Sequence, residues 1–257
     1  MFQSLGRALA AFLTRPDPKH QPIATSEPEV LLPALRRGDV LLVEGSSRVS
    51  SAIKYLTQST WSHAALYVGE AMPPGHQGKP TPSLLEADMR DGVRLVALEH
   101  YAQFHTRICR PVGLKVADID TLIDYAKTKV GHQYDLKNII DLLRYLVPTP
   151  PVPQRWRRRL IALGSGDPTQ AICSSLIAKT FQSVRYPILP VVKKSRYGDP
   201  AIARLGDEVL HIRHHSLFTP RDFDVSPFFE IVKPRLAAGF DPYALIWADT
   251  IDRESLN

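Results

Sequence analysis

WSHAALYVGE, residues 61–70, has the composition of a buried β-strand and places a histidine, His63, at the first position of that strand. A Trp-Ser turn precedes the apolar run and a glycine ends it, which is typical of strand boundaries. A strand holds its side chains rigidly, and the start of a strand lies at a domain edge where a cleft can form. The stretch therefore predicts a strand whose first side chain is either a hydrogen-bonded structural histidine or a histidine available for chemistry.

The segments around this strand alternate between further strands and helices. Four more strands are predicted, with Asp91-Gly92 as a hairpin turn, at residues 39–45, 84–89, 92–98 and 106–114. Four helices are predicted from apolar residues at helical spacing, at residues 46–59, 117–131, 135–147 and 169–184. We therefore expect an α+β fold in which a mostly antiparallel sheet packs against helices.

The chain divides into a central domain with an extension at each end. We expect an N-terminal amphipathic helix and a connecting arm over residues 1–34, the main domain over 35–235, and a C-terminal extension over 236–257. A proline-rich and basic insertion is expected at about 148–168. The N-terminal helix has three interpretations that remain open: a helix packed on the domain, an interfacial membrane anchor, or an export signal.

The charge balance favours anionic partners. The formal net charge is +6, which suits an anionic membrane surface, an acidic polymer or nucleic acid. Nucleic acid is disfavoured because the arginines are not interleaved with aromatic residues and no recognition motif is present. We expect a cytoplasmic protein, with association at the membrane periphery and export as open alternatives. The oligomeric state is left open.

Cys173 stands out because it lies in the first turn of the helix predicted at residues 169–184. Backbone N–H groups and a partial positive charge at a helix N-terminus stabilise a thiolate and lower the pKa of the thiol. The same N–H groups can bind the oxyanion that forms when a thiolate attacks a carbonyl. The competing interpretation is a small buried hydrophobic residue, because buried cysteines are common.

A thiolate nucleophile also needs a base, which histidine supplies near neutral pH. His63 is the candidate because it opens a strand, whereas the other histidines lie in loops or in a late polar cluster. Cys109 lies in a strand-like run, TRICRPV, and is expected to be structural. Neither cysteine shows the paired ligand spacing of a metal site, and no cofactor is expected.

Six segments, taken in order, give the chain a resemblance to a known family. They are GDVLLVEG (38–45), WSHAALYVG (61–69), LLEADMRDGV (84–93), GHQYDL (131–136), AICSSLIAKTF (171–181) and HHSLFTPRDFDVSPFFEIV (214–232). They resemble the permuted papain-like amidases of the YiiX/YaeF type, relatives of NlpC-type peptidases and of lecithin:retinol acyltransferases. His63 precedes Cys173 by 110 residues (173 minus 63), which is the permuted order of that family.

The resemblance implies a circularly permuted papain-like fold and assigns roles to four residues. It implies Cys173 as the nucleophile, His63 as the base and then the acid, and Glu86 as the third polar residue, which orients the imidazole. Tyr134 would hold the oxyanion or the substrate. Glu86 could instead be a solvated carboxylate replaced by Asp88 or Asp91, and Tyr134 could be a packed aromatic residue.

The function expected from these residues is a cysteine hydrolase that cleaves an amide or ester through a thioester. The substrate is expected to be a small molecule, an acyl or lipid-linked compound, or a cell-wall peptide. Two alternatives stay open: an acyltransferase with the same mechanism, and a non-catalytic module that binds a lipid or another ligand.

Overall fold

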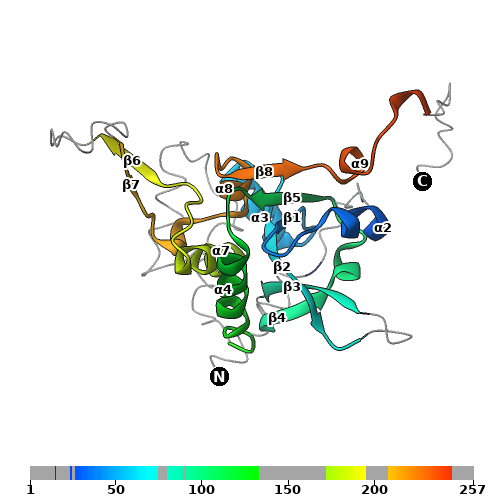
Figure 1. The fold of residues 1–257 in the computed structure, drawn as a ribbon, viewed down its shortest axis with the longest axis horizontal. Coiled ribbons are helices and arrows are strands. Elements are labelled where there is room, and N and C mark those ends of the chain that lie inside the picture. The colour runs from blue at the N-terminus through cyan, green and yellow to red at the C-terminus, as the bar shows by residue number, and fades with distance from the viewer. Residues whose placement is uncertain are drawn as a thin grey trace.

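The centre of the molecule is one six-stranded sheet with the strand order β4-β3-β2-β1-β5-β8, in which every neighbouring pair is antiparallel (Figure 1). The computed structural model describes residues 15, 24, 27–74, 80–88, 91–132, 172–194 and 208–244. The strands of the sheet are β1 (Val40–Val43), β2 (His63–Met72), β3 (Thr81–Asp88), β4 (Gly92–Ala97), β5 (Thr106–Pro111) and β8 (Phe229–Val232). This confirms the mixed helix and antiparallel sheet class that the sequence predicts.

Strand β1 lies inside the sheet, and its sequence explains that position. All four of its residues are apolar and buried, because both faces of the sheet are covered. Val40 and Leu42 belong to the hydrophobic cluster on one face, whereas Leu41 and Val43 belong to the cluster on the other. The alternation follows from the twofold period of side chains along a strand.

The helices that matter for the site lie on one face of the sheet. Helices α4 (Val116–Lys127) and α7 (Ile172–Ser183) lie side by side, and α7 also packs against β2 (Figure 1). Their inward residues, among them Leu122, Ile177 and Phe181, form one core with the sheet. Each such buried apolar side chain stabilises the fold by roughly 1.5–3 kcal/mol.

The remaining helical segments are mostly short. They are α2 (Pro28–Leu31), η1 (Leu32–Ala34), α3 (Arg48–Thr57), η3 (Leu98–Tyr101), η5 (His215–Leu217), α8 (Pro220–Asp224), α9 (Pro234–Ala237) and η6 (Pro242–Ala244). The longest of these, α3, begins after Ser47, whose hydroxyl accepts the N–H of Ser50. It ends at Gln58 in the left-handed conformation. Ser47 therefore caps the N-terminus of α3.

The C-terminal third contains elements that the sequence did not reveal. A separate hairpin is formed by β6 (Val191–Lys194) and β7 (Glu208–His211), and β8 completes the main sheet at its edge beside β5. Each of these strands has four residues, which is too short for a clear alternation of apolar and polar side chains. Tertiary pairing, more than local pattern, makes these segments strands.

Several predicted segments lie outside the described residues. They are the N-terminal helix, the helix predicted at 135–147 and the insertion at about 148–168. The boundaries predicted for the central domain also remain predictions. Among the described residues, no helix combines the length and the apolar character needed to cross a membrane.

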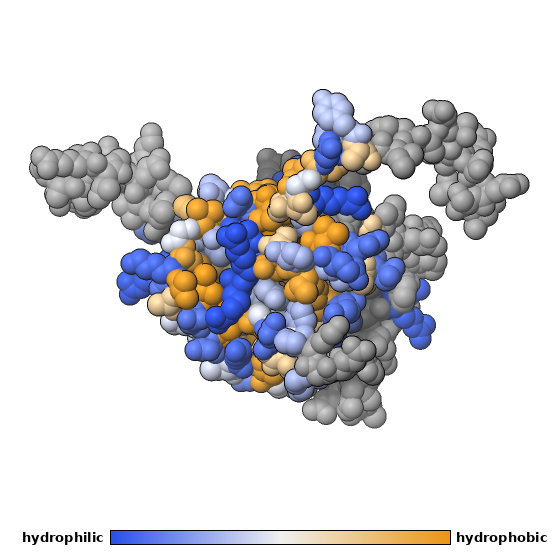
Figure 2. All heavy atoms as spheres, turned by 45° about the vertical axis from the view of Figure 1, so that its right-hand side comes forward, coloured by the Kyte–Doolittle hydropathy of each residue, from blue (hydrophilic) through white to orange (hydrophobic). Residues whose placement is uncertain are grey.

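The surface mixes polar and apolar side chains. On the face drawn in Figure 2, a band of hydrophilic residues runs between groups of hydrophobic ones. The exposed large apolar residues come from separate elements and include Tyr55, Val116 and Tyr243. Apolar residues scattered in this way are ordinary on a protein surface.

Candidate active site

His63 lies where β2 begins. It pairs with Val43 of β1. Further along β2, Leu66 lies opposite Leu85 of β3, and the pairing of these two strands continues to Met72 opposite Thr81. The predicted strand start at His63 is confirmed. The imidazole keeps 23% of its side-chain surface exposed, so it lies at the rim of the core and solvent can reach it.

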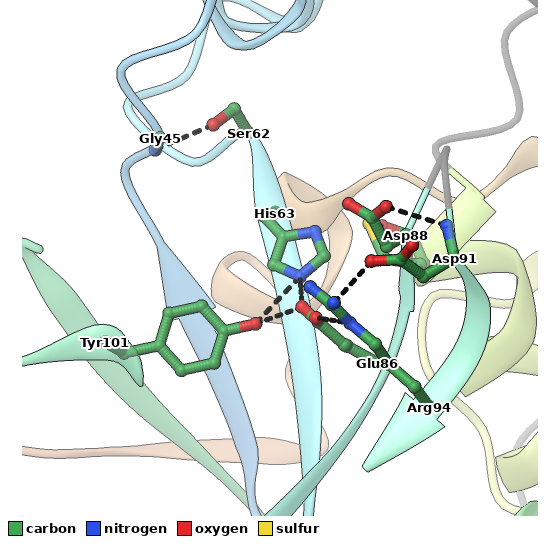
Figure 3. Close-up of polar contacts among 10 residues, drawn as sticks. Gly45, Ser62, His63, Glu86, Asp88, Asp91, Arg94 and Tyr101 are labelled. Carbon is green, nitrogen blue, oxygen red and sulfur yellow. Dashed lines mark hydrogen bonds and ion pairs between the residues drawn. The ribbon is translucent and has the colours of Figure 1, made fainter. Parts of the chain in front are cut away.

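Glu86 of β3 is the carboxylate that the fold brings to His63. Its Oε2 atom lies 2.7 Å from Nε2 of His63, and its side chain is almost fully buried (Figure 3). Its other oxygen, Oε1, accepts a hydrogen bond of 2.9 Å from Nε of Arg94, the residue opposite it on β4. A buried carboxylate requires such partners because an isolated buried charge is strongly destabilising.

The two alternative carboxylates lie elsewhere. Asp91 binds Nη1 of Arg94 at 2.5 Å, and Asp88 accepts the backbone N–H of Asp91 (Figure 3). Asp91 therefore contacts Arg94, which also binds Glu86, and Asp88 contacts the backbone of the turn between β3 and β4. Of the three carboxylates, the described contacts bring Glu86 to the imidazole.

Tyr101 joins the site without having been singled out in the sequence. It ends η3, is buried, and its hydroxyl donates a hydrogen bond to Oε2 of Glu86. The same hydroxyl oxygen lies 3.0 Å from Nε2 of His63 (Figure 3). No sequence motif surrounds Tyr101, so its contacts depend on the tertiary fold alone.

Cys173, on helix α7, also interacts with His63. It is the second residue of α7 and is 4% exposed, and the charge of His63 lowers the pKa of its thiol against the effect of burial. Its Sγ atom lies 3.9 Å from Oγ of Ser174. Since Nε2 of His63 faces Glu86 and Tyr101, Nδ1 is the ring nitrogen left for Cys173.

The electrostatics of these groups are coupled. Burial raises the pKa of Cys173, but the charge and hydrogen bond of His63 outweigh it, so the pKa lies below its ordinary value. Burial lowers the pKa of His63, yet Cys173 and Glu86 together raise it well above the ordinary value. Burial alone would raise the pKa of Glu86, but the hydrogen bond and charge of His63 lower it to about 2. These directions favour a thiolate, an imidazolium and a carboxylate together.

Cys109 provides the internal comparison. It lies in β5 opposite Val40, is fully buried, and burial raises the pKa of its thiol far above the ordinary value. A thiol with a raised pKa in apolar surroundings is inert. The pKa values of the two cysteines are therefore shifted in opposite directions.

Two further expectations concern residues and ligands around the site. Tyr134 lies outside the described residues, so its role remains a prediction. Within the part of the chain that the structure describes, no group of three or more metal-ligating side chains occurs. The contacts of His63 and Glu86 are with each other, with Tyr101, with Arg94 and with Cys173.

Comparisons with known proteins place this geometry in context. Residues 34–144 match the family of permuted papain-like amidase enzymes of the YaeF/YiiX type, family C92, which confirms the resemblance seen in the sequence. The chain is also similar to the crystal structure of the metalloprotein YiiX from Escherichia coli O157:H7, at 19% identity and a TM-score of 0.46, covering 77% of this chain and 96% of that one. No curated protein matches the chain.

Proposed function

Because residues 34–144 are similar to permuted papain-like amidases, we propose that this protein is a cysteine hydrolase with Cys173 as its nucleophile and His63 as its general base and acid. The observation that carries the proposal is the double engagement of His63. Nε2 of its ring contacts Glu86 and Tyr101, and the charge of the same imidazole lowers the pKa of Cys173. Glu86 orients the ring and stabilises the imidazolium, as the third residue of a catalytic triad does.

The proposed reaction is acyl transfer through a thioester. The thiolate of Cys173 attacks the carbonyl carbon of an amide or ester, and a tetrahedral oxyanion forms. The position of Cys173 at the start of α7 supports this step, because the first N–H groups of a helix have no partner within the helix and can donate to the oxyanion. The imidazolium of His63 then protonates the leaving amine or alcohol, and a thioester remains on Cys173.

The second half of the reaction releases the acyl group. Neutral His63 accepts a proton from water while the water oxygen attacks the thioester carbonyl. The carbon–sulfur bond breaks, the acid leaves, and the thiolate–imidazolium pair is restored. An amine or alcohol in place of water would give acyl transfer, so hydrolase and acyltransferase differ only in the acceptor.

For the substrate we propose an acyl compound or a peptide that carries the scissile amide or ester. The net charge of +6 supports anionic substrates or an anionic membrane surface as a further partner. The experiment offers activated acyl esters and acyl amides of increasing chain length as substrates. Turnover without an added amine measures hydrolysis, and turnover with an added amine measures acyl transfer. Turnover that disappears in Cys173→Ala supports an enzyme, whereas binding without turnover favours a ligand-binding module.

The direct test of the pair is the rate of thiol alkylation as a function of pH. Wild type is compared with Cys173→Ala, Cys109→Ala and His63→Ala, and the labelled residue is identified by mass spectrometry. We expect rapid labelling of Cys173 well below the ordinary thiol pKa of about 8.5, and slower labelling in His63→Ala. An ordinary thiol profile for Cys173, or equal rates without His63, would overturn the proposal.

A further inference from the structure

We propose that Tyr101 is a positioning residue that holds His63 in the tautomer with the proton on Nε2, and so leaves Nδ1 for Cys173. The inference rests on the proposed function, because it assigns a role within the same site. The Tyr101 hydroxyl contacts both residues of the Glu86–His63 pair: it donates to Oε2 of Glu86 and lies 3.0 Å from Nε2 of His63.

The direction of each hydrogen bond follows from the single proton of the hydroxyl. Tyr101 uses that proton on Glu86, which as a carboxylate can only accept. Toward His63 the Tyr101 oxygen can therefore offer only a lone pair. Both oxygens near Nε2, those of Glu86 and Tyr101, are acceptors, so Nε2 has to carry a proton. Neutral His63 then has its unprotonated nitrogen on the side of Cys173.

The surroundings of Tyr101 keep its hydroxyl in this arrangement. Burial, together with the charge of Glu86, raises the pKa of Tyr101 well above its ordinary value, so the hydroxyl keeps its proton. The ring is 4% exposed and packs edge-on against His100 at 5.1 Å and against Phe104 at 6.2 Å. The hydroxyl is therefore fixed by the core and does not need to be ordered by the substrate.

Charged groups face this network from three elements besides β2. They are Glu86 on β3, Arg94 on β4 and Cys173 on α7. Arg94 binds the oxygen of Glu86 that Tyr101 does not bind. The carboxylate is thus held at both oxygens, and it presents Oε2 to His63 in one orientation.

The decisive comparison is Tyr101→Phe against Tyr186→Phe in the full-length protein. Tyr186 serves as the control because its hydroxyl also makes tertiary hydrogen bonds, to Val112 and to the carbonyl of Phe228, at a partly exposed position away from the site. Both variants lose one such hydroxyl, so both are expected to unfold at lower urea concentration. Only a residue that positions His63 should also change the chemistry of Cys173.

The readout is the pH profile of Cys173 alkylation. In Tyr101→Phe the acid limb is expected to move to higher pH by about one unit, which is roughly a tenfold slower rate at mildly acidic pH. Tyr186→Phe is expected to follow wild type. A Tyr101→Phe profile that coincides with wild type, while His63→Ala still slows labelling, overturns the inference alone. An ordinary thiol profile in wild type overturns the proposed function and this inference together.

A second measurement leaves Tyr101 intact, so it does not depend on how the variant folds. The ring nitrogens of His63 are observed by ¹⁵N NMR in Cys173→Ala, at a pH where the imidazole is neutral. The expected tautomer has the proton on Nε2. A ring protonated on Nδ1 would overturn the inference.

Discussion

Nε2 of His63 and Oε2 of Glu86 lie 2.7 Å apart, although 23 residues separate them and they come from different strands. The contact joins a rim histidine to a buried carboxylate. We therefore expect Glu86 to affect both stability and reactivity, since its charge is stabilised by His63 and in turn stabilises the imidazolium.

Glu86→Gln is expected to change how stability depends on pH. The folded-state pKa of Glu86 is about 2, below its ordinary value of 4.5, so its ionised form stabilises the fold above pH 4.5. That contribution is lost as the pH falls from 4.5 toward 2. Urea unfolding should therefore show a large deficit for Glu86→Gln at pH 7 that shrinks at low pH. Asp120→Asn, which removes an exposed carboxylate, serves as the control, and a deficit independent of pH would contradict the assignment.

Arg94→Gln is expected to destabilise the protein by roughly 2 kcal/mol, because a buried carboxylate loses a charged hydrogen-bond donor. The matched control is Arg37→Gln, which breaks an exposed ion pair with Asp120 at 2.8 Å. Such surface pairs contribute less than about 1 kcal/mol. Chemical denaturation of both variants measures the difference. Equal losses would mean that Arg94 adds nothing beyond a surface ion pair.

Cys109→Ala is expected to leave the reactivity of Cys173 unchanged, because Cys109 is fully buried in β5 and its thiol pKa is strongly raised. In native wild type, an alkylating reagent should label one thiol, and the second should react only after unfolding. Peptide mapping by mass spectrometry identifies each site. Labelling of Cys109 in the folded protein at neutral pH would show that β5 opens more readily than its burial implies.

Gly45→Ala is expected to destabilise the loop that leads to the site. A Cβ atom at residue 45 would lie 2.3 Å from Oγ of Ser50 and 2.9 Å from Oγ of Ser62, which accepts the Gly45 N–H. Overpacking of this kind costs about 1–3 kcal/mol. Because Ser62 directly precedes His63, alkylation of Cys173 should also slow.

A second substitution separates this steric effect from other causes. Ser50→Ala removes the oxygen nearest to the new methyl group, so the double variant Gly45→Ala/Ser50→Ala should recover part of the lost stability. Thermal unfolding of the two single variants and the double variant completes the cycle. Strictly additive losses would contradict the proposed clash.

The sequence alone was sufficient for the features that depend on local pattern. The apolar run after His63 predicted strand β2 and helical spacing predicted α4, whereas the reactivity expected of Cys173 over Cys109 stays a prediction. Glu86 was named from a family resemblance, and the match over residues 34–144 confirms that resemblance. The catalytic roles of these residues remain predictions for the experiments above.

Only the tertiary structure revealed how the orienting groups meet. Arg94 reaches Glu86 because strand register places them opposite each other, and Tyr101 reaches both Glu86 and His63 from a short helical turn. The short strands β6, β7 and β8 likewise depend on their partners. Periodicity in a sequence encodes which face a residue occupies within its own element. Contacts between distant elements depend on register and packing, which no local pattern contains.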